Sequence, residues 1–219
     1  MCGRYALFTD PGKISDKLGL PSPPSGWQPG YNIAPGTGIL GVRYSESDGR
    51  AIFDRLWWGY RPHWADQSAP EPINARAEKL ESSRYFRGAF HSHRCLVPAD
   101  GWYEWQATDK GKQPWFFARE DREPVFMAGI WITNPDDRPS CAIITEPARG
   151  EAGDIHSRMP LVLDDGCLQK WLDPQLQDRE TLRQSMGRLD PDLLTCWPVS
   201  TEVNRTDNDS ADLVEPVGQ

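Results

Sequence analysis

The sequence predicts a single, loop-rich β domain with a few short helices. The length of 219 residues suits one domain with a full hydrophobic core. The 19 glycines and 20 prolines indicate many turns and favour an irregular β fold over a helix bundle. Because the chain shows no internal repeat and no domain-scale linker, we expect one domain over residues 1–205. An acidic, loosely ordered tail is expected over residues 206–219.

Short runs rich in β-branched and aromatic residues predict the strands. The first two runs flank Ser47-Asp48-Gly49, and this turn sequence predicts a β-hairpin. A later run ends at Pro98 and leads into Asp100-Gly101-Trp102-Tyr103-Glu104-Trp105. The strands expected on these grounds are residues 39–44, 51–58, 94–98, 115–119, 125–133, 141–145, 161–163 and 199–203.

Helix-start signals mark most of the helical segments. Thr9-Asp10-Pro11 places a capping side chain before a proline in the first turn. Asn74 is a second candidate cap, with Glu78 in the first turn, where its charge favours the helix dipole. Asp178 is a third candidate cap. We therefore expect helices over residues 12–18, loosely over 73–90, and over 166–172 and 178–189.

The net charge and the cysteines exclude several classes of protein. A net charge of −8 argues against a broad basic face for duplex DNA. A short basic channel stays compatible with it, because charges act over roughly 8 Å at physiological salt. The five cysteines form no CxxC pair and lack metal-ligand spacing to the four histidines, which predicts a reduced protein without metal or cofactor.

Targeting signals are also missing from the sequence. No apolar run reaches the ~20 residues of a membrane span. No signal peptide precedes Cys2. We therefore expect a cytoplasmic protein, nucleoid-associated if it is bacterial, with no membrane partner.

Cys2 carries the most distinctive chemistry in the sequence. Removal of Met1 turns Cys2 into an N-terminal cysteine, with an α-amine of reference pKa about 8 and a thiol of reference pKa about 8.5. The amine can form a Schiff base with an aldehyde, and the thiol can then close on the imine carbon to give a five-membered thiazolidine. The alternative is that Cys2 is an incidental residue of a frayed terminus.

Three other features are candidates for a functional site. Trp57, Trp58 and Trp64 lie close together in the sequence, either as core and lid residues or as an aromatic platform on which bases stack. Glu104 is flanked by aromatic residues, whose apolar walls raise a carboxyl pKa and suit it to proton transfer near pH 7. The alternative is an exposed acid on an alternating strand. His156 stands at a loop end, where functional residues gather, although a lone histidine is more often structural.

Five motifs occur in the order that is typical of one family and span most of the chain. They are Cys2-Gly3-Arg4-Tyr5, Tyr31-Asn32-Ile33-Ala34-Pro35, Asn74-Ala75-Arg76-Ala77-Glu78, Pro98-Ala99-Asp100-Gly101-Trp102-Tyr103-Glu104-Trp105 and His156-Ser157-Arg158-Met159-Pro160. On these motifs the chain resembles the SOS-response-associated peptidase (SRAP) family. It departs from the family pattern at Tyr60-Arg61, which replaces a more apolar pair, and at Arg149, where many members have asparagine.

The resemblance implies both a fold and an activity. The fold is an α+β domain of curled, barrel-like, mostly antiparallel β-sheets with short peripheral helices. The activity is that of a monomeric sensor of abasic sites in single-stranded DNA. Such a sensor shields the lesion during the DNA damage response by a covalent thiazolidine cross-link through Cys2.

The resemblance also implies a catalytic set, Cys2, Asn74, Glu104 and His156. Glu104 would transfer protons at the sugar and the imine, His156 would act on the ring-oxygen side, and Asn74 would orient the amine or the sugar oxygen. The same groups could remove Met1 by self-cleavage, which is the peptidase activity of the family name. An ordinary methionine aminopeptidase could also remove it.

The expected DNA contacts combine cations and aromatic rings. Phosphates would be bound by Arg4, Arg76 and Arg158, with Asn32 positioning the backbone; Trp58, Trp64 and Trp105 would stack on bases or block a paired strand. For Arg76 the alternative is a structural ion pair with Glu78 or Glu81.

Two other functions stay open at this point. One is a cysteine peptidase or amidohydrolase that acts on peptides in trans through Cys2, His156 and Asn74. The other is a non-covalent module for single-stranded nucleic acid, in which Cys2→Ala would leave binding intact. Peptide turnover and covalent capture of an abasic oligonucleotide discriminate between these functions.

Overall fold

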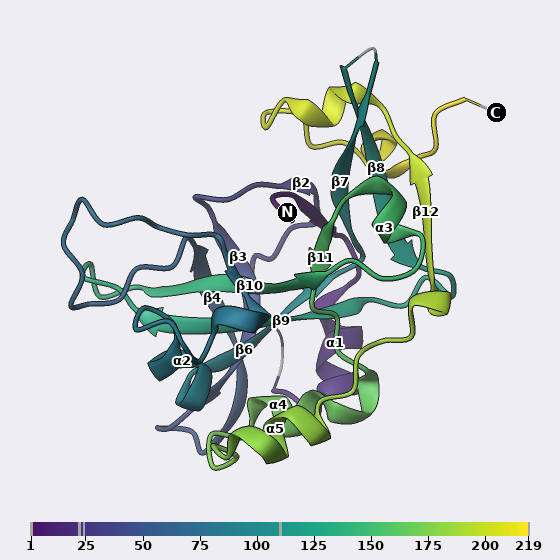
Figure 1. The fold of residues 1–219 in the computed structure, drawn as a ribbon. Helices are drawn as coiled ribbons and strands as arrows, with labels where there is room; N and C mark the ends of the chain where they lie inside the picture. Colours follow the sequence, from purple (N-terminus) through teal and green to yellow (C-terminus); the bar gives the residue numbers. More distant parts are fainter. Residues whose placement is uncertain (1, 22, 24, 110, 219) are drawn as a thin grey trace.

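Two β-sheets form the body of the protein (Figure 1). The computed structural model describes residues 2–21, 23, 25–109 and 111–218. The five-stranded sheet has the spatial order β12 (Leu194–Pro198), β8 (Gly111–Arg119), β7 (Gly101–Thr108), β1 (Tyr5–Leu7) and β2 (Gly30–Ile33). The seven-stranded sheet has the order β11 (Arg158–Pro160), β10 (Pro139–Pro147), β4 (Arg50–Trp58), β3 (Gly38–Ser45), β6 (Arg94–Ala99) and β9 (Val125–Thr133), with β5 (Asn74–Arg76) paired to β10.

The larger sheet closes on itself. β10 pairs with β4 at one end of the order and with β9 at the other, so that five of its strands form a closed ring. Among the described strand pairs, those of β10 with β4 and with β5 are parallel and the others are antiparallel. This architecture confirms the expected α+β domain of curled, mostly antiparallel sheets.

The helices are short and lie at the periphery. The described ones are α1 (Pro11–Leu18), η1 (Ala77–Lys79), α2 (Arg87–Ser92), α3 (Ala152–Ile155), η2 (Asp165–Cys167), α4 (Leu168–Leu172), α5 (Arg179–Ser185), η3 (Pro191–Leu193), η4 (Thr201–Asn204) and η5 (Ala211–Val214). In Figure 1, α4 and α5 lie below the barrel, and the C-terminal segment, in yellow, lies beside β7, β8 and β12 at the opposite end. Within the described residues, no helix combines the length and the apolar character needed to cross a membrane.

Local sequence signals explain the first helix and the first hairpin. The Asp10 side chain accepts a hydrogen bond from the backbone N–H of Gly12 at 2.7 Å, and Pro11 begins α1, as the capping signal predicts. Gly19 ends this helix in the left-handed conformation, at φ 60°. The expected hairpin is formed by β3 and β4, in register from Gly38 opposite Trp57 to Ser45 opposite Arg50.

Tertiary pairing overrides the local signal in other places. The helix expected from residue 73 is wrong at its start, because Asn74–Arg76 forms β5 and pairs in parallel with Ile143–Thr145 of β10. Only α2 near the end of that segment is α-helical. The strand expected at residues 199–203 is also wrong. The Ser200 side chain accepts a hydrogen bond from the N–H of Glu202 and caps η4 instead.

The hydrophobic core has two parts. The larger cluster contains residues of both sheets, among them Cys2, Trp58 and Trp102, each 0% exposed. The smaller cluster joins Tyr103 and Phe116 of the five-stranded sheet to residues of the C-terminal segment, such as Leu213. The C-terminal segment therefore covers one face of that sheet, while the other face packs toward the barrel.

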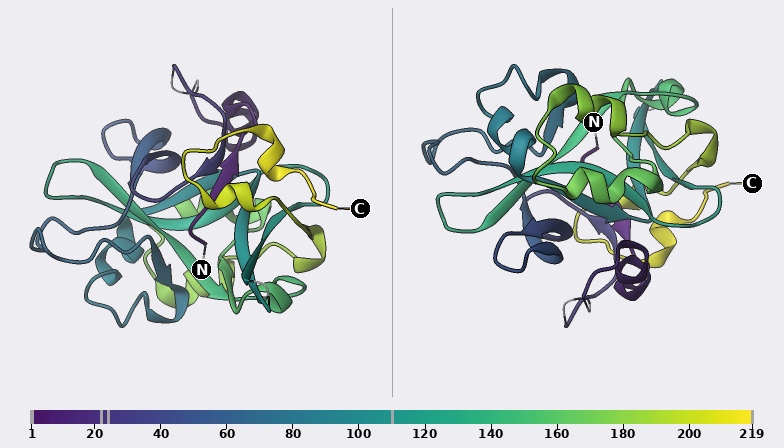
Figure 2. Two further views of the ribbon diagram at one scale, coloured as in Figure 1. Left: turned by 90° about the horizontal axis from the view of Figure 1, so that it is seen from above. Right: turned by 90° about the horizontal axis from the view of Figure 1, so that it is seen from below.

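The residues after position 205 contact the domain at several points. The Oδ1 of Asp209 accepts hydrogen bonds from the backbone N–H groups of Tyr31 at 2.5 Å and Asn32 at 2.9 Å on β2, the edge strand of its sheet. Leu213 of η5 is 3% exposed. Figure 2 shows this segment, in yellow, above the first strand in the left view. The domain boundary at residue 205 and the mobility of the tail stay predictions.

Candidate functional site

Cys2 lies inside the protein, next to Asn74. Its side chain is fully buried, and the Asn74 Nδ2 donates a hydrogen bond to the backbone oxygen of Cys2 at 2.9 Å. The Asn74 Oδ1 is buried and has no hydrogen-bond partner among the described residues. Burial raises the pKa of the Cys2 thiol well above its ordinary value, and the nearby charge of Glu104 raises it further. The thiol is therefore neutral near pH 7.

Glu104 is a buried acid on β7. It is 2% exposed, and its burial raises the pKa of the carboxyl group, while the positive charge of a protonated His156 acts in the opposite direction. The Glu104 Oε2 lies 3.9 Å from the His156 Nδ1. Burial thus makes this carboxyl group easier to protonate than an exposed one, which suits it to proton transfer. The expectation of a buried acid with a raised pKa is confirmed, and the exposed alternative is wrong.

His156 is held between α3 and β11. Its backbone N–H donates to Ala152 O at 3.0 Å and ends α3, and its ring is partly exposed, at 29%. The His156 Nδ1 lies 3.0 Å from the backbone nitrogen and 3.0 Å from the backbone oxygen of Arg158, so Arg158 holds the ring in place from one side. An imidazole ring can donate or accept a proton near neutral pH.

The structure thus brings together the four residues expected to act in catalysis. They come from separate parts of the chain: the segment before β1, β5, β7 and the residue between α3 and β11. Asn74 contacts Cys2, the charge of Glu104 acts on the Cys2 thiol, and Glu104 faces His156. Their chemical roles stay predictions.

The three arginines expected to bind phosphates have different surroundings. Arg76 is exposed, and no described residue bonds its side chain. Arg158 forms the described ion pair with Glu78, and the charge of Arg76 also acts on that carboxyl group. The alternative of an ion pair of Arg76 with Glu78 or Glu81 stays a prediction. The Arg4 side chain donates to Asn32 Oδ1 at 2.7 Å and to Val203 O at 3.0 Å, which fixes it at the edge of β1.

Asn32 has a structural environment that the sequence did not indicate. It is 4% exposed, and its Nδ2 donates to the backbone oxygens of Val203, Arg205 and Asn208. All of its polar atoms therefore bind protein, and a direct contact of this side chain with DNA does not fit the structure. Asn32 instead holds the C-terminal segment beside Arg4.

The three tryptophans expected to stack on bases differ in their exposure to solvent. Trp58 is fully buried and donates from Nε1 to Ile73 O at 3.0 Å, so it is a core residue and cannot stack on a base here. Trp64 is 51% exposed and has its ring edge against Tyr85. Trp105 is partly buried, and its Nε1 donates to Asn204 Oδ1 at 2.7 Å. Trp64 and Trp105 remain available to a ligand.

The two departures from the family pattern have protein partners. Arg61 forms an ion pair with Glu71 at 2.8 Å and lies near Asp136 at 3.3 Å. Arg149 pairs with the buried Glu146 at 3.2 Å and donates to Leu189 O. Neither arginine contacts Cys2, Asn74, Glu104 or His156 in a described bond. The departures therefore change the supporting structure and leave the central group intact.

Sequence reasoning missed Thr145. It is 0% exposed, and its backbone oxygen and hydroxyl accept from the Arg158 NH2 at 2.6 Å and 3.2 Å. It lies on β10 between β5 and β11, so it adjoins the strands that carry Asn74 and Arg158. A threonine in a strand run has no local signal of this kind; only the strand order reveals it.

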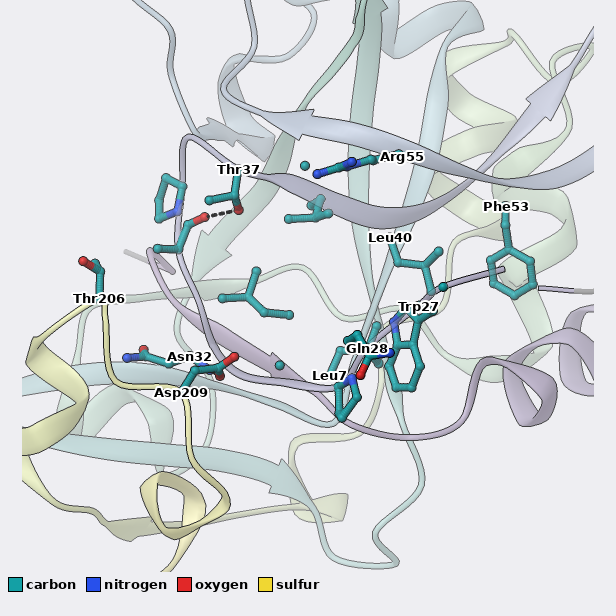
Figure 3. Close-up of a pocket in the computed structure, with 18 of the residues that line it drawn as sticks. Leu7, Trp27, Gln28, Asn32, Thr37, Leu40, Phe53, Arg55, Thr206 and Asp209 are labelled. Carbon is teal, nitrogen blue, oxygen red and sulfur yellow. Dashed lines mark hydrogen bonds between the residues drawn. The ribbon is translucent and has the colours of Figure 1, made fainter. Parts of the chain in front are cut away.

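A large groove of about 1030 Å³ lies elsewhere, beside β2, β3 and β4. Figure 3 shows Trp27, Leu40 and Phe53 at one end of it and Asn32, Thr206 and Asp209 at the other. None of the four central residues lines it. In the part of the chain that the structure describes, no three His, Cys, Asp or Glu side chains gather as a metal would need.

Comparisons with known proteins agree with this arrangement. The chain is 37% identical over 191 residues to the abasic site processing protein YedK of Escherichia coli, which covers 85% of this chain and 84% of that protein. It is 35% identical over 225 residues to the abasic site processing protein YoqW of Bacillus subtilis, with 98% and 99% covered.

Solved structures share the fold. A protein from Bacteroides thetaiotaomicron matches with a TM-score of 0.85 at 19% identity, over 99% of this chain and 100% of that chain. A phage-related protein from Bordetella bronchiseptica matches with a TM-score of 0.74 at 32% identity, over 91% and 95%. The family model described as SOS response associated peptidase (SRAP) matches residues 1–206. The five sequence motifs and these matches lead to the same conclusion: the chain belongs to the SRAP family.

Proposed function

We propose that this protein recognises abasic sites in single-stranded DNA and captures the sugar aldehyde covalently through Cys2. The observation that carries the proposal is the group around Cys2, where an amide and a buried acid from two other segments act on the second residue of the chain and a histidine from a third lies beside that acid. Two relatives at 35–37% identity carry abasic site processing in their names, which supports the choice of substrate.

The reaction begins with release of Met1. The free α-amine of Cys2 then attacks C1′ of the open-chain deoxyribose, and loss of water gives an imine. The thiol adds its sulfur to the imine carbon, and its proton moves to the nitrogen, which closes the thiazolidine ring. No external oxidant or reductant enters these steps.

Each neighbour of Cys2 has a role in this sequence. Asn74 Oδ1, which is buried without a described partner, can accept a hydrogen bond from the new α-amine. Glu104, with its raised pKa, moves protons between amine, sugar oxygen and departing water. His156 transfers a proton on the ring-oxygen side and so favours the open aldehyde. A neutral thiol suits a late attack on an imine better than it suits peptidase catalysis, which needs a thiolate as the nucleophile.

DNA would enter along the exposed side of this group. Arg76 is the most accessible of the three expected phosphate ligands, and protein contacts fix the positions of Arg4 and Arg158. Trp64 and Trp105 are partly exposed rings, and each stacked base is worth ~1–3 kcal/mol. Cations combined with stacking rings favour a single strand, whose bases are free to stack, over a duplex.

The test is covalent capture. A uracil-containing single strand is treated with uracil glycosylase, incubated with the protein and resolved by denaturing electrophoresis. We expect a stoichiometric, heat-stable adduct for the wild type, none for Cys2→Ala, and slower formation for Glu104→Gln. Intact mass should show loss of Met1 in the reactive protein. Turnover of a peptide panel without any adduct, or binding that Cys2→Ala leaves unchanged with no adduct in the wild type, would refute the proposal.

A further inference from the structure

An ion pair between Glu78 and Arg158 joins the segments that follow Asn74 and His156 in the chain. The Arg158 NH1 lies 2.5 Å from Glu78 Oε1, and its NH2 lies 3.1 Å from Glu78 Oε2, so the carboxylate meets the guanidinium with both oxygens. The NH2 also donates to Thr145 O at 2.6 Å. The Arg158 Nε is buried and has no described partner. Glu78 and Thr145 therefore hold the guanidinium by its terminal nitrogens alone.

The position of the Glu78–Arg158 ion pair in the fold lets it affect the positions of Asn74 and His156. Glu78 lies in η1, directly after β5, the strand of Asn74, whereas Arg158 begins β11, two residues after His156. β5 and β11 both pair with β10 around Thr145. The ion pair thus links the segment that follows Asn74 to the strand that follows His156.

Arg158 passes this constraint directly to the histidine. Its backbone nitrogen and its backbone oxygen each lie 3.0 Å from the His156 Nδ1, so the backbone of Arg158 fixes the position of the ring. Its side chain is only 12% exposed, whereas that of Glu78 is 48% exposed. The guanidinium of Arg158 is fixed by its ion pair, and its backbone is fixed by strand pairing. The backbone N–H of Arg158 therefore stays beside the imidazole ring of His156.

The same carboxylate acts against DNA binding. Arg158 is an expected phosphate ligand, and a negative charge within 2.5 Å of its NH1 competes with any phosphate for that edge. Removing the charge of Glu78 should therefore strengthen binding of the strand. Loss of the anchor should at the same time slow the chemistry, since His156 is less well oriented. These opposite effects separate a positioning role from general damage to the fold.

We propose that Glu78 is a positioning residue that orients His156 through Arg158, and that it does so at the expense of DNA affinity. The inference rests on the proposed function, because its main readout is adduct formation. It assigns to Glu78 the balance between binding the strand and reacting with it.

The experiment compares Glu78→Gln, Arg158→Lys and the double variant with wild type. Glu120→Gln is the matched control, since it removes one carboxylate from an exposed turn after β8. Affinity is measured with a single strand that carries a tetrahydrofuran abasic analogue, which has no aldehyde. The adduct rate constant is measured at saturating abasic DNA. Exchange of the Arg158 amide hydrogen reports its bond to His156 without any DNA.

For Glu78→Gln we expect affinity to rise about 2- to 5-fold, since exposed charge pairs are worth up to ~1 kcal/mol. The adduct rate constant should fall about tenfold, and the Arg158 amide should exchange faster, because loosened positioning of a catalytic group costs about that much. Glu120→Gln should match the wild type. The double variant should react no more slowly than Arg158→Lys, because Glu78 acts through Arg158.

Other outcomes overturn the inference in distinguishable ways. If wild type forms no adduct, the proposed function fails and this inference with it. If wild type forms the adduct but Glu78→Gln leaves the rate and the amide exchange unchanged, only the inference fails. A parallel fall of affinity and rate, with an additive double variant, indicates a merely structural role and also overturns it.

Discussion

Alanine substitution of Trp58 and Trp64 distinguishes a core side chain from a ligand-binding one. Both tryptophans were expected to stack on DNA, but Trp58 is fully buried and Trp64 is 51% exposed. Trp58→Ala removes a buried indole, which typically costs ~3–5 kcal/mol of unfolding free energy. It also removes one donor to Ile73 O, which keeps its hydrogen bond from the Ile143 N–H and so adds little to this cost.

Trp64→Ala should have the opposite profile. Surface substitutions usually change stability by no more than about 0.5 kcal/mol, and the half-exposed ring should lie near that range. If a base stacks on Trp64, its loss weakens single-strand binding by ~1–3 kcal/mol, or about 5- to 150-fold. The two variants should therefore differ in which property they change.

Urea unfolding and fluorescence anisotropy measure the two properties. For Trp58→Ala we expect a fall of about 3–5 kcal/mol in unfolding free energy, with affinity of the remaining folded protein near that of wild type. Trp58→Phe serves as a control that retains much of the volume and loses the N–H donor. A Trp58→Ala protein of normal stability but weak DNA binding would refute the core assignment. A Trp64→Ala protein with unchanged affinity would refute stacking at that residue.

Three further substitutions test other contacts. Burial raises the pKa of Glu104, so its contribution to stability is complete below the ordinary carboxyl pKa of about 4.3 and is lost as pH rises through the raised value. In urea titrations, Glu104→Gln should therefore be more stable than wild type at pH 7–8, and this difference should vanish near pH 4. Adduct formation should slow ~10²-fold or more. Equal stability of the two proteins at all pH values would contradict the burial argument. Asp209→Ala should lower the unfolding free energy by about 1–2 kcal/mol, since two N–H groups of edge strand β2 lose their acceptor; an unchanged urea midpoint would show that water replaces the carboxylate. Arg76→Ala should reduce the slope of log affinity against log salt by about 0.7 with unchanged stability, and an unaltered slope would remove Arg76 from the phosphate ligands.

Local patterns predicted those elements whose signals lie within a few residues. The helix after Asp10 and the hairpin around Gly49 depend on a cap and on a turn, and both formed where expected. The helix expected from residue 73 was wrong because a capping side chain such as that of Asn74 contributes only about 1 kcal/mol. Pairing of three residues with β10 outweighs it. Short strands such as β1 and β5 have too few residues to show a period.

The candidate site was predictable in its centre and not at its margins. Motifs in family order identified Cys2, Asn74, Glu104 and His156, and the fold brings them together. Burial is a property of the whole fold. The sequence therefore could not show that Trp58 is enclosed or that the side-chain amide of Asn32 donates hydrogen bonds to the C-terminal segment. The pairing of Glu78 with Arg158 joins residues 80 positions apart and leaves no local trace.

The bonds of Arg4 and Asn32 to residues 203–208 have a consequence for biosynthesis. Arg4 donates to a carbonyl 199 positions later, and Asn32 to carbonyls at 203, 205 and 208. During translation those acceptors are made 171 to 199 positions after their donors. The bonds that fix Arg4 and Asn32 therefore cannot form on a nascent chain until residues 203–208 have been synthesised.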